Sequence, residues 1–423
     1  MSKLHFSLLL SVTLAIIIGY SCQFKPVTPP SQPKEIPRET QSEPTVELET
    51  EYAIPAEYQP LYEEISQKLE AFDIYLDSHW DGTKSNVIFG AELLPANGHQ
   101  GEKLLTEENY KGTLAYLNGL QSLGINGVKI AISYPILAPD FPDSDRYLEY
   151  YKDLAQELRK RDMKILVAIG NFFQDSSFTD LQVSISNLTF AQYRQTKRQI
   201  AERIIKEIHP DYLTIANEPS TEAMTTGLKV TVPEFTETVR YVLNGLDRSN
   251  VLVGAGAGTW NHLDYVKSLA RDTSLDYIDV HIYPANFLEQ AITIADIAHT
   301  YNKRLIIGEA WTYKVYDREL GDLDDIATQA VIFGRDIYSF WEPLDSRFLE
   351  TLVKLANYNG YEFISPFWSK YFFAYLDYET VPKNLNYRQL TQLSNQEAFQ
   401  NILSNEPTPT GLTYQELINT ASK

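Results

Sequence analysis

The chain contains few of the residues on which several classes of protein depend. It has one cysteine, Cys22, in 423 residues, which excludes a framework of disulfide bonds. Its seven histidines show no His-Glu-x-x-His or similar spacing, so we expect no catalytic metal. Lysine and arginine number 36 against 56 aspartate and glutamate residues, and the net charge of -20 argues against a nucleic-acid partner, which would need a basic surface. No Gly-x-Gly-x-x-Gly fingerprint of a dinucleotide-binding site follows an early strand, and we expect no cofactor.

Long apolar runs are also scarce, and the clearest one lies near the N-terminus. Lys3 precedes an apolar run from Leu8 to Ile18, which is too short to span a bilayer comfortably. Together with the small residues that follow, it is typical of a secretory signal over residues 1–22. Cys22 directly after the run resembles the lipidated cysteine of bacterial lipoproteins, although Gly19 stands where that family usually has leucine, and ordinary cleavage nearby is the alternative. We therefore expect an exported protein that contacts a membrane only through a lipid anchor.

The composition divides the rest of the chain into three parts. Residues 23–57 repeat proline with serine, glutamate and glutamine and contain little that is apolar, which predicts a disordered tether. Residues 58–405 carry the apolar patterns of one globular domain, preceded by an extra helix over Tyr58–His79 that we expect to cover the lower end of the fold. Residues 406–423 form a C-terminal tail. We expect a monomer.

Within the globular part, apolar strands alternate with helical stretches. The expected strand segments are Asn86–Leu94, Gly127–Ser133, Met163–Gly170, Tyr212–Pro219, Val251–Ala255, Tyr277–Ile282, Arg304–Trp311 and Tyr361–Phe367. The expected helices are Glu107–Leu123, Arg146–Arg161, Thr189–His209, Pro233–Leu246, Asp264–Ala270, Leu288–Tyr301, a helical region over Asp325–Tyr358, and Gln389–Leu403. Eight such strands separated by helices predict an α/β fold with a parallel sheet closed into a (β/α)8 TIM barrel, in one catalytic domain.

Two of these strands deliver a glutamate at their C-terminal ends. The fourth ends in Asn217-Glu218-Pro219, and the seventh contains Glu309 after Ile306-Ile307-Gly308. The C-terminal ends of barrel strands share one face, where the chemistry of such barrels is found. Two carboxyl groups about 5 Å apart can hydrolyse a glycosidic bond with retention, one as proton donor and one as nucleophile. We expect Glu218 and Glu309 to form such a pair.

This arrangement resembles clan A of the glycoside hydrolases, the 4/7 superfamily of retaining glycosidases, and is most similar to glycoside hydrolase family 5. The resemblance covers roughly residues 87–368. It implies that Glu218 is the acid/base, that Asn217 binds the 2-hydroxyl of the sugar, and that Glu309 is the nucleophile. The family's His-x-Tyr after strand six is matched by His281 and Tyr283, which imply contacts that hold the site and orient the nucleophile.

The remaining expected contacts include two departures from that family. Trp368 matches the family's tryptophan after strand eight and is expected to stack on a sugar ring. Lys129 stands on strand two where the family has arginine, and Asn171 stands after strand three where it has histidine. Glu92 and Trp311 would also face the cleft if the strand register is right, each equally open to a structural role.

The sequence thus predicts a retaining β-glycosidase that acts on a poly- or oligosaccharide. The long segments Pro95–Thr106, Phe172–Asn187 and Ser220–Val232 are expected to wall its cleft, and the identity of the sugar cannot be read from them. The alternative is a catalytically silent carbohydrate-binding lipoprotein on the same fold, against which the intact glutamate pair argues.

Overall fold

Eight parallel strands form a closed barrel in the computed structural model, which describes residues 53–421 except 182, 184, 186 and 324. The strands are β1 (Ile88–Phe89), β2 (Gly127–Tyr134), β3 (Lys164–Asn171), β4 (Tyr212–Thr214), β5 (Leu252–Gly258), β6 (Tyr277–Ile282), β7 (Arg304–Ala310) and β8 (Phe363–Pro366). Each strand pairs with the next in the chain from β2 to β8, and β8 pairs with β1. The circle closes where the amide of Lys129 donates to the carbonyl of Ala91 and the amide of Leu93 donates to the carbonyl of Lys129, both at 2.9 Å. The expected (β/α)8 barrel is confirmed.

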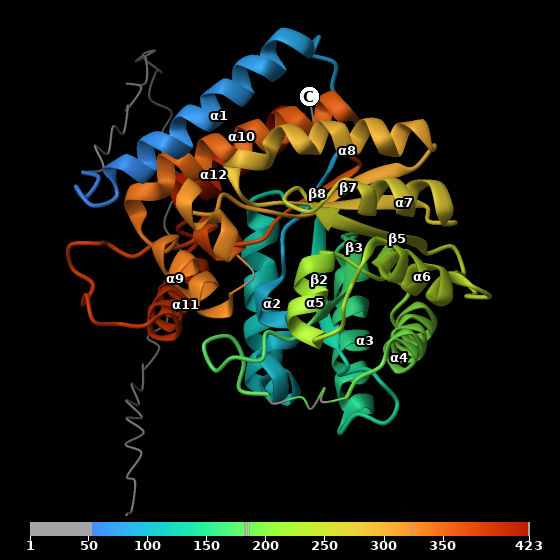
Figure 1. Cartoon of the computed structure of the whole chain (residues 1–423). Coiled ribbons are helices and arrows are strands. Elements are labelled where there is room, and N and C mark those ends of the chain that lie inside the picture. The colour runs from blue at the N-terminus through green and yellow to red at the C-terminus, as the bar shows by residue number, and fades with distance from the viewer. Residues whose placement is uncertain (1–52, 182, 184, 186, 324, 422–423) are drawn as a thin grey trace, which may run out of the picture. The chain divides into compact units, whose positions relative to one another are not determined.

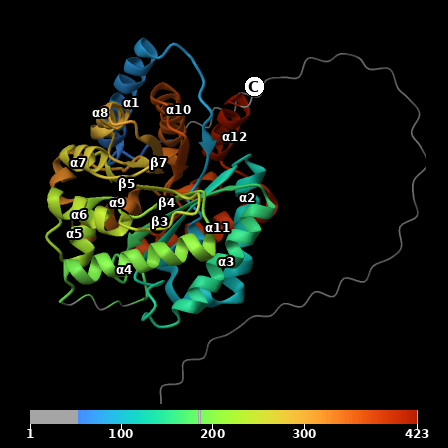
Figure 2. The ribbon, with the colours of Figure 1, turned by 90° about the vertical axis from the view of Figure 1, so that its right-hand side faces the viewer.

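Helices surround the barrel because every crossover between parallel strands runs over its outside (Figures 1 and 2). The α-helices are α1 (Gln59–His79), α2 (Glu107–Ser122), α3 (Ser144–Lys160), α4 (Phe190–Arg203), α5 (Pro219–Thr226), α6 (Val232–Leu243), α7 (Asp264–Asp272), α8 (Leu288–Thr300), α9 (Ile326–Arg335), α10 (Glu342–Asn359), α11 (Tyr387–Ser404) and α12 (Pro409–Ala421). None of the helices within residues 53–421 has the length and apolar character needed to cross a membrane.

The inside of the barrel changes character from one end to the other. Near the N-terminal ends of the strands, Leu166, Tyr212, Tyr277, Ile306 and Phe363 form a separate buried apolar cluster. The next layer of side chains toward the C-terminal ends contains buried polar groups such as Thr214 and Asp279. The apolar layer seals the lower end, so the polar residues above it face the C-terminal mouth.

Two terminal helices differ from what the sequence led us to expect. The apolar face of α1, which includes Leu61, Leu69 and Leu76, packs chiefly against α10 on the outside of the barrel, so the helix does not cover the lower end. The segment expected as a tail contains α12, which packs against α10 and buries Tyr414 completely. The expected signal peptide, Cys22 and most of the tether lie outside the described residues.

Candidate active site

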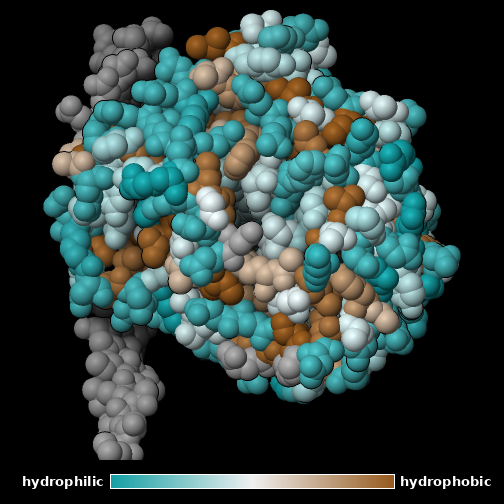
Figure 3. All heavy atoms as spheres, viewed as in Figure 1, coloured by the Kyte–Doolittle hydropathy of each residue, from teal (hydrophilic) through white to brown (hydrophobic). Residues whose placement is uncertain are grey.

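A pocket of about 270 Å³ lies at the C-terminal ends of the strands, a size suited to a small ligand or part of a chain. Residues from all three long segments contribute to its walls, among them His99, Phe178 and Thr221. The third segment is not a plain loop, because it contains α5. In the space-filling view the surface is hollowed near the centre of this face, with hydrophobic residues around the hollow (Figure 3).

Glu218 enters the pocket from a sharp turn between β4 and α5. Its backbone is left-handed (φ 46°), a conformation that non-glycine residues seldom adopt. Pro219 follows at the first position of α5, where its missing N–H is not needed. The hydroxyl of Thr221, one turn into the helix, donates to Glu218 Oε2 at 2.7 Å. The turn therefore stores backbone strain in order to hold one carboxylate at the mouth.

Glu309 reaches the pocket because β7 contains an irregularity directly before it. Val280 pairs with Ile307, but the next residue, His281, pairs with Glu309, so Gly308 is left over as a bulge. The amide of Gly308 donates to Asp279 Oδ1 at 2.9 Å, and a Cβ at position 308 would lie 2.2 Å from that same oxygen. Only glycine fits there, and the bulge turns Glu309 toward the strand that carries His281.

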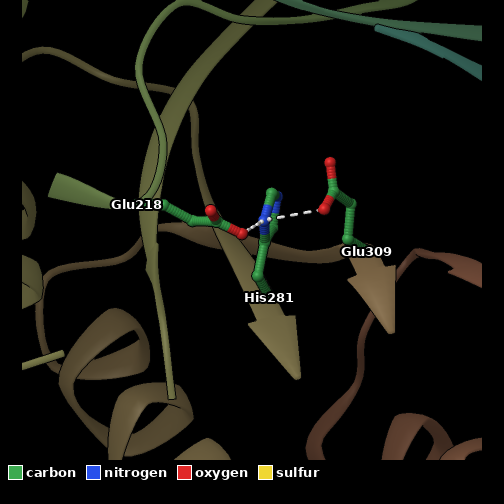
Figure 4. Close-up of side chains that lie close together, drawn as sticks. All are labelled: Glu218, His281 and Glu309. Carbon is green, nitrogen blue, oxygen red and sulfur yellow. Dashed lines mark hydrogen bonds and ion pairs between the residues drawn. The ribbon is translucent and has the colours of Figure 1, made fainter. Parts of the chain in front are cut away.

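The side chains of Glu218 and Glu309 line the pocket and meet at the buried ring of His281 (Figure 4). The imidazole Nδ1 lies 2.6 Å from Glu218 Oε1 and 3.4 Å from Glu309 Oε2. One ligand atom from each of the three groups lies within 4.8 Å of the others, so the two carboxylates approach to within that distance. This bound is compatible with the spacing of about 5 Å expected of a retaining pair.

Glu309 is held in its ionised form. Lys129 Nζ forms an ion pair with Oε1, and the hydroxyl of Tyr283 donates to Oε2 at 2.6 Å. Burial alone would raise the pKa of Glu309, but His281 and Lys129 outweigh it and lower the pKa to about 2. A carboxylate with these partners is ready to act as a nucleophile at neutral pH.

His281 is fully buried and lies among carboxylates on both sides. Its Nε2 is 3.6 Å from Asp279 Oδ2 and 3.5 Å from the amide of Asn217. Burial opposes a charge on the ring, but Glu309 and Asp279 overcome it and raise the pKa of His281 to about 10. The protonated ring therefore bridges Glu218 and Glu309, and Asp279 stabilises it from below.

Lys129 and Glu92 do not line the pocket. Both side chains have no exposed surface, and Lys129 Nζ lies 3.1 Å from Glu92 Oε2 as well as against Glu309. Burial raises the pKa of Glu92 to about 7, and Lys129 offsets this in part. The sugar contacts expected of these two residues are not supported, because a ligand could touch neither. Lys129 reaches the site through its ion pair with Glu309, and Glu92 accepts a hydrogen bond from Asn97 of the pocket wall.

The other expected site residues divide into two groups. Asn171, Asn217, Tyr283 and Trp368 line the pocket. His281 and Trp311 are completely buried behind it, and Trp311 packs against Tyr371 instead of facing the cleft.

Several residues of the site escaped the sequence analysis. Asp279 was missed although a carboxylate inside an apolar strand is a signal for a buried partner. Tyr313 stacks on Tyr283 with ring centroids 4.3 Å apart, and Phe333 meets Trp368 edge-on at 5.5 Å. These two rings come from a loop and a helix whose sequences contain no motif.

Glu218, His281 and Glu309 are also the one set of described residues that could share a metal ion. The donor atoms fit a metal poorly. The Lys129 ammonium already forms an ion pair with Glu309, and the raised pKa of His281 favours a protonated ring. The groups are better suited to moving and holding protons. The absence of a catalytic metal stays a prediction.

Comparison with known proteins finds similarity only at the level of three-dimensional structure. The sequence matches no described family, and no curated protein is significantly similar to it. An exo-β-1,4-mannosidase from Opitutaceae bacterium strain TAV5 superposes with a TM-score of 0.44 and 13% identity over 67% of this chain and 52% of that chain. A family 1 β-glucosidase from the fungus Humicola insolens superposes with a TM-score of 0.48 and 10% identity over 80% and 99%. A family 113 β-1,4-mannanase superposes with a TM-score of 0.43 and 13% identity over 75% of this chain and 99% of that chain. Similarity this low does not assign a function.

Proposed function

We propose that the protein is a retaining β-glycosidase of the clan whose catalytic glutamates end strands four and seven. The observation that carries the proposal is the pair of carboxylates within 4.8 Å in one pocket, in unlike surroundings. Retaining enzymes hold their carboxyl groups about 5–5.5 Å apart, whereas inverting enzymes leave about 6.5–9.5 Å for a water molecule. Carboxylate oxygens within 4.8 Å of each other fit the retaining spacing better than the inverting one.

The surroundings of the two carboxylates divide the roles between them. Glu309, ionised by Lys129 and His281, attacks the anomeric carbon as the glycosidic bond breaks. Glu218 gives a proton to the departing oxygen. In the second step Glu218 takes a proton from water, the water oxygen attacks the same carbon, and Glu309 is released as a carboxylate. Each displacement inverts the anomeric centre, so the product retains the configuration of the substrate.

Tyr283 and Trp368 support the reaction from the pocket walls. The Tyr283 hydroxyl binds Glu309 Oε2 and leaves the other oxygen to Lys129, which fixes the plane of the nucleophile. Trp368 presents an indole to the pocket, and such a surface suits the apolar face of a pyranose. Asn217 lies beside Glu218 on the same turn, within reach of a sugar hydroxyl.

The test replaces each glutamate separately and follows product configuration. Glu309→Gly should lose activity by a factor on the order of 10⁴ or more, and azide should restore turnover by giving a glycosyl azide of inverted configuration. Glu218→Ala should still be glycosylated by aryl glycosides with good leaving groups, since these need little proton donation, and azide should then give a retained product. Proton NMR of the products distinguishes the two.

The reverse stereochemistry in the two variants would exchange the roles of the glutamates. If the wild-type chain hydrolyses no β-glucoside, β-mannoside or β-galactoside but still binds oligosaccharides, the silent binding protein would replace the enzyme.

A further inference from the structure

The pocket carries both signs of charge, on different walls. The carboxylates of Glu218 and Glu309 come from the ends of β4 and β7. Three cations, Lys103, Lys370 and Arg388, line the pocket from the segment after β1, the segment after β8 and the start of α11. Asp180 and Glu222 also line the pocket, so what distinguishes each cation is whether it has an acidic partner.

Two of these cations are already neutralised in part. Arg388 lies 2.5 Å from Asp180, and Lys103 lies 3.5 Å from the same carboxylate. Their side chains are 37% and 59% exposed, so water also screens them. They form an ordinary ion-pair group at the rim.

Lys370 differs from both. It is only 2% exposed, and its ammonium makes no hydrogen bond or ion pair with any residue of the part of the chain that the structure describes. The groups next to it are the rings of Trp368 and Tyr371, with centroids 5.1 and 5.0 Å from Nζ. Burial lowers its pKa to about 7, and Asp336 opposes this only in part. A buried cation without a partner is costly.

The position of Lys370 indicates which ligand group would pair with its ammonium. Trp368 offers the ring on which a sugar would stack. Lys370 lines the same pocket, and its ammonium lies over that ring system. The indole Nε1 of Trp368 is likewise a donor without an acceptor in the described residues. A negatively charged, acceptor-rich substituent on a sugar beside Trp368 would meet an unpaired cation.

We propose, building on the glycosidase function above, that Lys370 forms a subsite for an anionic substituent of the carbohydrate. The substituent is a carboxylate, as in a uronic acid, or a sulfate ester, and the substrate is thereby an acidic saccharide. Charge-assisted hydrogen bonds are about twice as strong as neutral ones, so the subsite gives selectivity for the charged sugar.

Binding of matched disaccharides tests this directly. Sulfur-linked disaccharides of the gluco, manno and galacto series resist hydrolysis, and each can be made neutral, as the 6′-uronate and as the 6′-sulfate. Calorimetry should show that the wild-type chain binds one of the anionic forms at least about tenfold more tightly than its neutral counterpart. Lys370→Met should abolish that preference and leave the affinity for the neutral form unchanged. The uronate and sulfate arms distinguish the two sources of charge.

Two further variants keep the test decisive. Lys370→Arg keeps the charge and should keep much of the preference. Lys103→Met removes an exposed, paired cation of the same pocket and should change the preference by less than about threefold. Methionine fits an apolar site, and an unchanged or higher melting temperature of Lys370→Met will show that the chain still folds.

Equal binding of neutral and anionic forms by the wild-type chain, or no binding of any anionic form, would overturn the proposal. So would a preference that survives Lys370→Met. These outcomes are independent of the glycosidase test: hydrolysis of neutral aryl glycosides that is lost in Glu309→Gln would uphold the enzyme while the acidic subsite falls.

Discussion

Two clusters in this protein each combine one lysine with two carboxylates, and they differ in their surroundings. In the first, Lys129 lies between Glu92 and Glu309. In the second, Lys314 lies between Asp336 and Asp345, at 3.2 and 2.5 Å. Each therefore places one ammonium between two carboxylates.

The difference is access to the pocket. All three charged side chains of the Lys314 cluster have no exposed surface, and the cluster joins the segment after β7 to α9 and α10. In the Lys129 cluster, Glu309 keeps 13% of its side chain exposed and lines the pocket. The comparison shows that a lysine between two carboxylates does not by itself mark a catalytic site. What matters is whether one carboxylate can meet a ligand.

The largest effect is expected from removing the lysine of the sealed cluster. Lys314→Met leaves Asp336 and Asp345 buried without a cation, and loss of one partner of a buried ion pair costs about 3–5 kcal/mol of stability. Urea denaturation should show this loss, while kcat of the folded fraction should hardly change. Burial already raises the pKa of Asp336 to about 7.

The loss of stability in Lys314→Met should depend on pH, because the pKa of Asp336 is raised. A carboxyl with a folded pKa above its unfolded value binds more protons when folded, so stability falls as pH rises from about 4 through the folded pKa. The destabilisation of Lys314→Met should therefore be smaller at pH 5 than at pH 8. The matched variant Lys354→Met removes a half-buried lysine paired with Asp73 and Asp77 and should cost much less. An equal cost in both variants would contradict this view of the sealed cluster.

In the open cluster the equivalent change should act mainly on catalysis. Lys129→Met removes the cation that helps to lower the pKa of Glu309. We expect kcat/KM to fall by a factor on the order of 10²–10³, the usual result of losing one electrostatic group of a site. The acid limb of the pH–rate profile should also move to higher pH, because Glu309 would ionise less readily. Lys129→Arg should recover part of the rate, and a profile with an unmoved limb would show that Lys129 serves only packing.

The barrel was predictable because its signal is repeated. Each strand is a mainly apolar run, and segments with helical periodicity separate the runs, so eight elements could be counted without knowing any contact. Glu218 and Glu309 were predictable for the same reason, since they follow such runs directly. Short strands such as Ile88–Phe89 and the extent of α12 depend on tertiary packing, which a single segment does not reveal.

Side-chain exposure could not be predicted in the same way. Lys129 lies on β2, and Glu92 and Trp311 follow β1 and β7, but whether such residues face the pocket or pack behind it depends on neighbouring strands and on irregularities such as the Gly308 bulge. A one-residue irregularity reverses which face a side chain takes. Lys370 carried no motif at all, and its unpaired state is visible only once Trp368 and Tyr371 are placed around it.

The smallest effect is expected from Glu92, which has no exposed surface and does not line the pocket. Burial raises its pKa to about 7, so in the wild-type chain it changes charge near neutral pH. Ionised Glu92 competes with Glu309 for Lys129, and protonated Glu92 does not. The pH–rate profile should therefore show an inflection near pH 7 of less than about tenfold, because the two carboxylates interact mainly through Lys129. Glu92→Gln keeps the acceptor for Asn97, which donates to Glu92 Oε1 at 3.2 Å, but cannot ionise, so the inflection should disappear.

In the sealed cluster, Asp336→Asn should leave the profile of kcat/KM unchanged. If Glu92→Gln keeps the inflection, or Asp336→Asn removes it, access to the pocket is not what separates the two clusters.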